Sequence, residues 1–91
     1  MIIPAELVKS ADELKNEGNA FFLEGHFAKA TELYTMAIEK SCSDKALAVY
    51  LCNRSIAQIK LENYGSALAD AEAAINSLVS EMPSFRNSSS R

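Results

Sequence analysis

The chain has 91 residues, of which 48% are hydrophobic and 23% are charged, and its formal net charge is −3. This composition is typical of a globular chain and unlike that of a disordered or collagen-like one. Because attraction to phosphate needs a basic surface, an acidic chain is a poor general binder of nucleic acid or of anionic membranes. The longest apolar stretches span only a few residues, which excludes a membrane-spanning helix.

The first residues of the chain have neither the basic start nor the apolar stretch of a signal peptide. Two cysteines, Cys42 and Cys52, are too few for a disulfide framework. We therefore expect a reduced protein in the cytoplasm, and the nucleus stays open as a second compartment. A single histidine, His26, leaves almost no material for a metal site or a histidine-based triad, so we expect no metal and no cofactor.

Apolar residues recur every three or four positions from about residue 10 to residue 79, which predicts four amphipathic helices. The first is expected to begin near Ser10, because Ser10 and Glu13 have the spacing of a capping box. We expect it to end at Gly25, which supplies a left-handed turn. The second helix is expected over about residues 27–40.

The third helix is expected to start at a cap formed by Ser43 or Asp44 and to run to about residue 61. A tight turn at Glu62 and Asn63 follows, in which Asn63 tolerates a positive φ. The fourth helix is then expected from about residue 64 to residue 79.

The helical region repeats itself at an offset of 37 residues, which places Phe27 and Ala30 on Tyr64 and Ala67. Small residues at the repeated positions are suited to close helix crossings. A helix-turn-helix unit of this length is near the tetratricopeptide period of about 34 residues. The predicted division is an N-terminal lead (1–9), a first repeat (10–44), a second repeat (45–81) and a flexible serine-rich tail that is the remnant of a third repeat (82–91).

Four stretches resemble the tetratricopeptide repeats of co-chaperones. Residues 14–22 resemble the opening helix of a repeat, and residues 27–39 resemble its second helix. The run Cys-Asn-Arg-Ser at 52–55 matches the opening of the next repeat, and residues 64–71 are especially similar to the repeat domain of the protein phosphatase 5 type. The resemblance implies an all-α fold of two tandem hairpins, a truncated piece of a right-handed α-solenoid.

The resemblance also implies a protein-interaction module. Such co-chaperones bind the acidic tails of the seventy- and ninety-kilodalton heat-shock chaperones, which end in Glu-Glu-Val-Asp. The family holds the terminal carboxylates in a clamp of Lys, Asn, Asn, Lys and Arg, and three of these match Lys15, Asn19 and Asn53. Continuing the alignment places the second lysine on Asn87 and the arginine on Arg91, which lies in a serine-rich stretch with no helix to hold it, so the clamp is expected to be incomplete by two cations.

The residues themselves agree with this role. Lys15 and Asn19 are one helical turn apart and border the packing face that contains Gly18. Asn53 lies on the third helix, which stacks beside the first in such a fold, so the three polar groups are expected to meet in one groove. The further groove residues expected are Phe22, Ile56, Lys60 and Arg91.

Other interpretations stay open. Lys15 is also compatible with a solvated surface lysine, and Asn53 and Arg54 with a hydrogen-bonded pair that packs helices together. The chain is also compatible with a structural or self-association fragment of little peptide affinity, because a missing third repeat would leave the fourth helix exposed. The residues concerned are Leu68, Ala71, Ile75 and Leu78.

Several remaining residues are interpreted as structural. Asp12 is assigned to a solvated helix flank, and the two cysteines are expected to be buried or half-buried thiols. The three tyrosines, Tyr34, Tyr50 and Tyr64, are expected to pack in the core. No phosphate-binding loop, catalytic triad or metal-ligand spacing is found, so we expect no enzyme.

Overall fold

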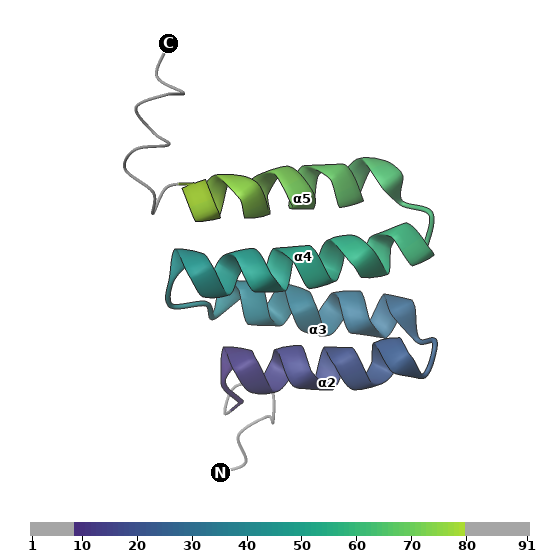
Figure 1. Cartoon of the computed structure of the whole chain (residues 1–91). Coiled ribbons are helices and arrows are strands. Elements are labelled where there is room, and N and C mark those ends of the chain that lie inside the picture. The colour runs from purple at the N-terminus through teal and green to yellow at the C-terminus, as the bar shows by residue number, and fades with distance from the viewer. Residues whose placement is uncertain (1–8, 80–91) are drawn as a thin grey trace.

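A computed structural model describes residues 9–79, which form four α-helices and no strand (Figure 1). The helices stack in chain order, each antiparallel to its neighbour, as two hairpins. The predicted all-α fold of two tandem hairpins is therefore confirmed, while the expected tail at 82–91, with Asn87 and Arg91, lies outside the described residues. The helices are α2 (Ala11–Leu23), α3 (Phe27–Glu39), α4 (Asp44–Lys60) and α5 (Tyr64–Val79).

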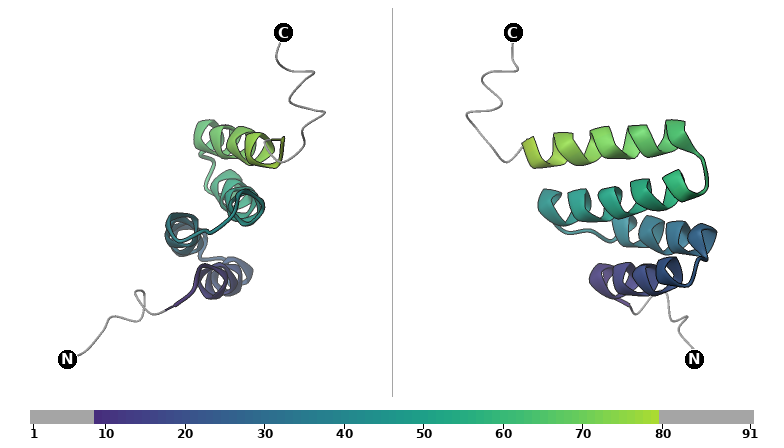
Figure 2. Two further views of the ribbon diagram at one scale, coloured as in Figure 1. Left: turned by 90° about the vertical axis from the view of Figure 1, so that its left-hand side faces the viewer. Right: turned by 45° about the vertical axis from the view of Figure 1, so that its right-hand side comes forward.

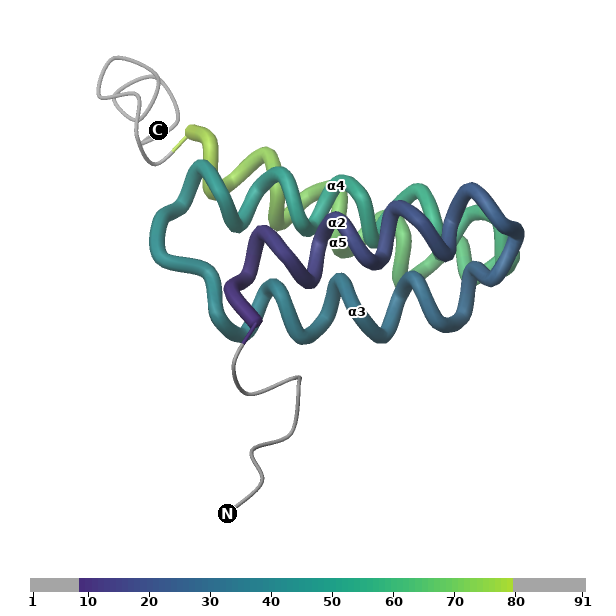
Figure 3. Tube along the Cα trace, turned by 90° about the horizontal axis from the view of Figure 1, so that it is seen from below, coloured from purple at the N-terminus to yellow at the C-terminus, as the bar shows by residue number. Residues whose placement is uncertain are grey.

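The hairpins are arranged so that α2 and α4 share one face of the stack. Seen end-on, α3 lies to one side of α2 and α4 (Figure 2). Seen from below, α2 projects between α3 and α4 (Figure 3). A hydrogen bond of 3.2 Å from the Tyr50 hydroxyl to Asp12 Oδ1 joins α4 directly to α2. Side chains from the first helix of each hairpin therefore meet on the same face.

Both first helices begin at the caps that the sequence predicts. Ser10 Oγ accepts a hydrogen bond from the Glu13 amide at 3.2 Å, and Glu13 Oε1 accepts one from the Ser10 amide at 2.9 Å. At the start of α4, Ser43 Oγ accepts from the Ala46 amide at 3.1 Å. Each serine thus satisfies a backbone donor that the first turn of a helix leaves unpaired.

The helix α2 ends in a Schellman motif around Gly25, whose φ is 88°. The amide of His26 donates to the Phe21 carbonyl at 2.9 Å, and the amide of Gly25 donates to the Phe22 carbonyl at 3.0 Å. These are the two hydrogen bonds that define this type of helix end, and they require a left-handed residue between them.

The helix α4 ends in the same motif, which corrects the prediction for the second turn. The amide of Asn63 donates to the Gln58 carbonyl at 2.8 Å, and the amide of Glu62 donates to the Ile59 carbonyl at 2.9 Å. The left-handed residue is Glu62, with a φ of 64°, and not Asn63. The two hydrogen bonds fix the residue after the C-cap Leu61 in this conformation, whatever its side chain.

The core is built from small residues that let large ones approach. A Cβ atom on Gly18 would lie 2.6 Å from Cε1 of Tyr34, so only glycine allows α2 to pack this closely on the Tyr34 ring. Tyr34 and Leu14 are the largest fully buried side chains among residues 9–79. The buried alanines include Ala30, Ala37, Ala57 and Ala74.

Arg54 ties three helices together. Its Nε and one terminal nitrogen donate to the two carboxylate oxygens of Asp70 on α5, at 2.6 and 2.7 Å. Its other terminal nitrogen donates to Thr35 Oγ1 on α3 at 3.0 Å. The hydrogen bond to Asp70 raises the pKa of the guanidinium above its ordinary value, with the charge of Asp70 acting in the same direction and burial against it. Arg54 therefore joins the hairpins as a structural residue.

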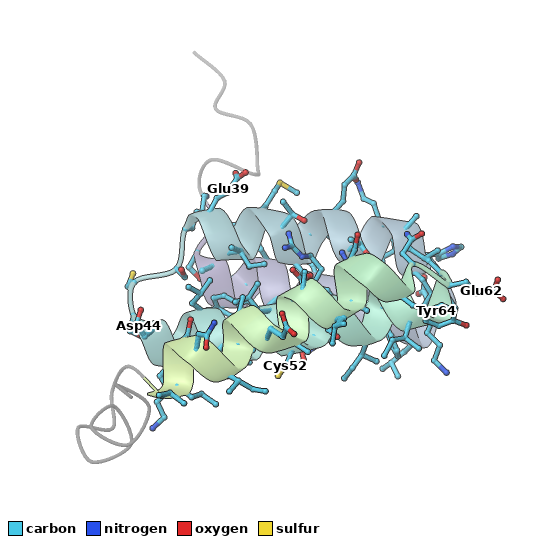
Figure 4. The ribbon with its side chains drawn as sticks, turned by 90° about the horizontal axis from the view of Figure 1, so that it is seen from above. Glu39, Asp44, Cys52, Glu62 and Tyr64 are labelled. Atoms are coloured by element: carbon cyan, nitrogen blue, oxygen red, sulfur yellow. The ribbon has the colours of Figure 1, made fainter. Side chains whose placement is uncertain are left out.

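The cysteines and one tyrosine are placed differently from the prediction. Cys42 and Cys52 are free and exposed, because Cys42 lies in the join before α4 and Cys52 lies on an open side of α4 (Figure 4). Tyr34 and Tyr50 are buried as expected, whereas Tyr64 is exposed at the start of α5. The reason is its place on the outermost described helix, which packs on α4 with one side and is not covered by any described helix on the other (Figure 1).

The outer surface of α5 is apolar, as the sequence predicts. Leu68 is 62% exposed and Ile75 is 59% exposed, Leu78 is also exposed, and Ala71 is half-buried. No helix within residues 9–79 is both long enough and apolar enough to cross a membrane.

Candidate functional site

A small hollow forms where the first helices of the two hairpins meet α3. It has a volume of about 90 Å³, and one wall comes from each of α2, α3 and α4. The structure thus brings together Asn19 and Asn53, the two asparagines that the sequence singles out, with Phe22 and Ile56 from the expected groove. Its lining residues are Asn19, Phe22, Tyr34, Asn53 and Ile56.

Helical spacing explains why these side chains share the hollow. Asn19 follows Gly18, whose missing side chain brings α2 onto Tyr34, and Phe22 lies about one turn further along α2. Asn53 and Ile56 are three residues apart on α4 and so lie on one helix face. The ring of Phe22 packs edge-to-face on Phe27, with 5.1 Å between the ring centroids. The contact with Phe27 therefore holds the Phe22 ring in place at the side of the hollow.

Asn19 is oriented by the base of the hollow. The Tyr34 hydroxyl donates a hydrogen bond to Asn19 Oδ1 at 2.5 Å. With Oδ1 bonded to Tyr34, the Nδ2 amide group is the donor that Asn19 offers to a ligand. Burial raises the pKa of Tyr34 above its ordinary value of 10.0, so the hydroxyl is a donor at neutral pH.

Lys15 lies one turn before Asn19 on α2 and is not among the residues that line the hollow. Its side chain is mostly buried, and its ammonium is 3.4 Å from Asp12 Oδ1. The same oxygen accepts the hydrogen bond from Tyr50. The cation is thus shared with a carboxylate of its own helix.

The other expected groove residues are further away. Lys60 is exposed in the last turn of α4, one turn beyond Ile56, and it does not line the hollow. Arg91 lies outside the described residues. Because α2 and α4 run in the same direction, Lys15 lies toward the N-terminal ends of the helices and Lys60 toward their C-terminal ends. A basic side chain is therefore found on either side of the hollow.

The chemistry of the hollow suits an anionic group with an apolar neighbour. It offers side-chain amides beside Phe22 and Ile56, with a lysine one turn away. A volume of about 90 Å³ exceeds the space that a single water molecule needs, which is about 10–15 Å³. Within residues 9–79 no group of three or more histidine, cysteine or acidic side chains is placed to hold a metal ion.

Two residues of the site were not predicted in these roles. The sequence places Tyr34 only in the core, and nothing in its spacing indicates that its hydroxyl reaches Asn19, 15 residues earlier. Asp12 was assigned to a solvated flank, although its place three residues before Lys15 is a signal for an ion pair on one helix face.

The chain is similar to several proteins of known name. It is 49% identical over 61 residues to serine/threonine-protein phosphatase T of Schizosaccharomyces pombe, a match that covers 67% of this chain and 12% of the relative. It is 49% identical over 67 residues to human small glutamine-rich tetratricopeptide repeat-containing protein beta, covering 74% and 21%. It is 42% identical over 73 residues to rat serine/threonine-protein phosphatase 5, covering 79% and 14%.

The matched stretch is about as long as the two hairpins, and the chain spans about a fifth or less of the length of these relatives. The similarity to the phosphatases thus lies in the helical repeats and not in a catalytic domain. No protein-family model matches the chain, and no solved structure matches it. With two tandem helical hairpins and these relatives, the chain belongs to the tetratricopeptide repeat proteins, and its repeats are those of the protein phosphatase 5 type, which serve protein interaction.

Proposed function

We propose that this repeat domain binds the acidic C-terminal tails of the seventy- and ninety-kilodalton heat-shock chaperones, which end in Glu-Glu-Val-Asp. The observation that supports this most directly is that Asn19 of α2 and Asn53 of α4 line one hollow. A terminal carboxylate in the hollow would accept hydrogen bonds from both side-chain amides. Lys15 would provide the positive charge from one turn away, and Phe22 and Ile56 would contact the apolar part of the last residues.

The affinity expected for such a peptide depends on a small number of contacts to its charged carboxylate. A hydrogen bond to a charged group contributes about 1.5–3 kcal/mol. Against this, the ammonium of Lys15 already lies 3.4 Å from Asp12 Oδ1, so part of its charge is compensated before a ligand arrives. We therefore expect saturable but weak binding that weakens further as salt screens the attraction between Lys15 and the carboxylate.

A calorimetric titration of the full chain with a short peptide ending in Glu-Glu-Val-Asp tests the proposal. The peptide with a free carboxylate should bind, and its amidated form should bind more weakly. Lys15→Ala and Asn53→Ala should each weaken binding by about tenfold or more, the loss of one charge-assisted hydrogen bond. Lys29→Ala removes a lysine that pairs with Glu32 at 3.3 Å on α3, outside the hollow, and serves as the matched control. If no heat of binding is measured at millimolar concentrations of the peptide, the proposal is refuted.

A second candidate function is self-association through the outer face of α5. It is favoured by the exposure of Leu68 and Ile75 and by an apolar hollow of about 270 Å³ between α4 and α5, to which Ile59 and Tyr64 contribute. Sedimentation velocity over a concentration series tests it. Leu68→Ser should shift the equilibrium toward monomer, whereas Leu23→Ser, at an exposed leucine at the end of α2, should not. A wild-type chain that stays monomeric at all concentrations would eliminate this candidate.

A further inference from the structure

We infer that Tyr34 is a positioning residue for ligand selection: its hydroxyl fixes the Asn19 amide so that Asn19 presents only N–H donors to the hollow and thereby favours a free carboxylate over a carboxamide. The inference rests on the proposed peptide-binding function and assigns a part of its specificity to a residue of α3. The carrying observation is the hydrogen bond from the Tyr34 hydroxyl to Asn19 Oδ1 at 2.5 Å.

The Tyr34 ring is held in place from several sides. Only 2% of the residue is exposed, and it packs in a cluster with Ala30 and Ala57. The backbone of Gly18 allows the ring so close an approach that even a methyl group would overlap with it. A ring enclosed in this way has one position, so its hydroxyl is a fixed reference for the side chain of Asn19.

The hydroxyl decides which end of the Asn19 amide faces the hollow. If the amide were turned over, Nδ2 would face the phenol oxygen, and the buried O–H would lose the acceptor it has now. Tyr34 also lines the hollow, so a ligand that fills the hollow displaces the water that would otherwise replace this acceptor. A buried donor without a partner carries a desolvation penalty, and this penalty opposes the turned-over form. Burial also raises the pKa of Tyr34, so the group remains a donor well above neutral pH.

The consequence is a difference between two kinds of ligand end. A carboxylate has only acceptors and matches the fixed Nδ2 donors of Asn19. A carboxamide has an NH₂ group as well, and where this group meets Nδ2 the contact is donor against donor. An asparagine free to turn over would accommodate both ends, whereas an asparagine held by Tyr34 favours the carboxylate.

The test compares two peptides on matched variants of the full chain. Peptides ending in Glu-Glu-Val-Asp, with either a free carboxylate or a terminal amide, are titrated against wild type, Tyr34→Phe and Tyr64→Phe. The preference of wild type for the free carboxylate should fall in Tyr34→Phe by about two- to tenfold, the range expected of the one neutral hydrogen bond that holds the Asn19 amide. Tyr64→Phe removes the hydroxyl of an exposed tyrosine outside the hollow and should keep the wild-type preference.

A role for Tyr34 in packing alone would weaken both peptides equally and leave the ratio unchanged, and an unchanged ratio overturns the inference. If wild type binds neither peptide, the proposed function itself fails, so the two failures are distinct. A measurement on wild type covers the case in which Tyr34→Phe does not fold. In nuclear Overhauser spectra, the Nδ2 protons of Asn19 should give no strong contact with the Tyr34 ring protons next to the hydroxyl, and a strong contact would show the reversed amide and refute the inference.

Discussion

Gly25 and Glu62 occupy equivalent places in the two hairpins, 37 residues apart, and both have a positive φ. Each follows the C-cap of the first helix of its hairpin and lies between the two hydrogen bonds of a Schellman motif. The repeat thus preserves a backbone conformation and not a residue type. A glutamate in the left-handed region is strained by its Cβ, whereas a glycine is not.

This relationship predicts opposite effects at the two positions. Glu62→Gly should raise the free energy of unfolding by about 0.5–1 kcal/mol, because the strain removed exceeds the extra entropy of the unfolded chain. Glu62→Ala removes the same charge but keeps the Cβ, and should give no such gain. Gly25→Ala should lower the free energy of unfolding by about 1 kcal/mol. Urea unfolding followed by circular dichroism measures all three, and a stabilising Glu62→Ala would attribute the effect to charge instead.

Gly18 should be intolerant of any side chain. A Cβ there would lie 2.6 Å from Cε1 of Tyr34, and the enclosed ring has little room to retreat. Gly18→Ala should therefore lower the free energy of unfolding by about 1–3 kcal/mol, the usual effect of overpacking, despite the better helix propensity of alanine. The matched control is Gly65→Ala on α5, where a Cβ meets nothing within 4 Å and the propensity gain should prevail. Equal effects at the two glycines would contradict the proposed overlap.

Local signals explain which parts of the fold could be predicted from the sequence. The caps at Ser10 and Ser43 depend on residues three positions apart, so their spacing is visible in the chain itself. The convergence of Asn19 and Asn53 was also predictable, because the repeat offset places both on the first helix of a hairpin. The prediction of Asn63 as the left-handed residue is wrong, because residue type favours Asn63 but Glu62 is the residue that follows the C-cap.

Contacts between helices could not be predicted in the same way. The exposure of Cys52 depends on which side of α4 its neighbours cover, and helix periodicity does not specify that side closely enough. The bond from Tyr34 to Asn19 depends on how closely α2 and α3 cross, which one glycine determines. The pairing of Tyr50 with Asp12 joins residues 38 positions apart and depends on how one hairpin stacks on the other.

The ion pair between Arg54 and Asp70 should be the most sensitive polar contact of the fold. Asp70→Asn leaves the guanidinium without its counter-charge in a largely buried position, where 21% of the Arg54 side chain and 10% of the Asp70 side chain are exposed. We expect the free energy of unfolding to fall by about 3 kcal/mol, the lower end for breaking a buried pair, because Arg54 keeps some solvent. Glu32→Gln disrupts an exposed pair with Lys29 and should cost less than about 0.5 kcal/mol. Thermal unfolding measures both variants. A similar loss of unfolding free energy in Asp70→Asn and Glu32→Gln would contradict this prediction.

The buried tyrosines should make the domain sensitive to alkaline pH. Burial raises the pKa of Tyr34, and burial followed by the hydrogen bond and charge of Asp12 raises the pKa of Tyr50. A raised pKa means that the folded state binds the proton more tightly than the unfolded state does. The resulting stability is fully present below the ordinary value of 10.0 and is lost as the pH rises above it.

Urea unfolding at a series of pH values from about 9 to 11.5 measures this loss. Tyr50→Phe should be less stable at neutral pH but should show a shallower fall in stability above pH 10 than wild type, because one of the linked protons is gone. Tyr64→Phe, at an exposed position, controls for the titration of lysines that all variants share. Parallel curves for wild type and Tyr50→Phe would exclude a contribution of Tyr50 to the linkage.

Asp12 should limit the affinity of the hollow for anions, because its carboxylate lies beside the nearest cation. Oδ1 of Asp12 is 3.4 Å from the Lys15 ammonium and also accepts the hydrogen bond from Tyr50. Asp12→Asn removes the charge but keeps an oxygen for Tyr50, so the contact between α2 and α4 is retained. Lys15 is then free to pair with a bound carboxylate, and the repulsion of the ligand by Asp12 disappears. We expect the peptide with a free carboxylate to bind about two- to fivefold more tightly, the range of a partly exposed ion pair.

Salt and a matched variant separate this effect from a general change in net charge. The gain in Asp12→Asn should persist when salt screens distant charges, because the compensation of Lys15 acts over a few ångströms and not over a Debye length of about 8–10 Å. Glu32→Gln makes the same change in net charge on α3, at a residue paired with Lys29, and should leave the affinity within experimental error at high salt. If Glu32→Gln increased the affinity as much as Asp12→Asn, or if Asp12→Asn gave no increase, Asp12 would not compete with the ligand for Lys15. The Lys15 ammonium would then be fully available to the bound carboxylate.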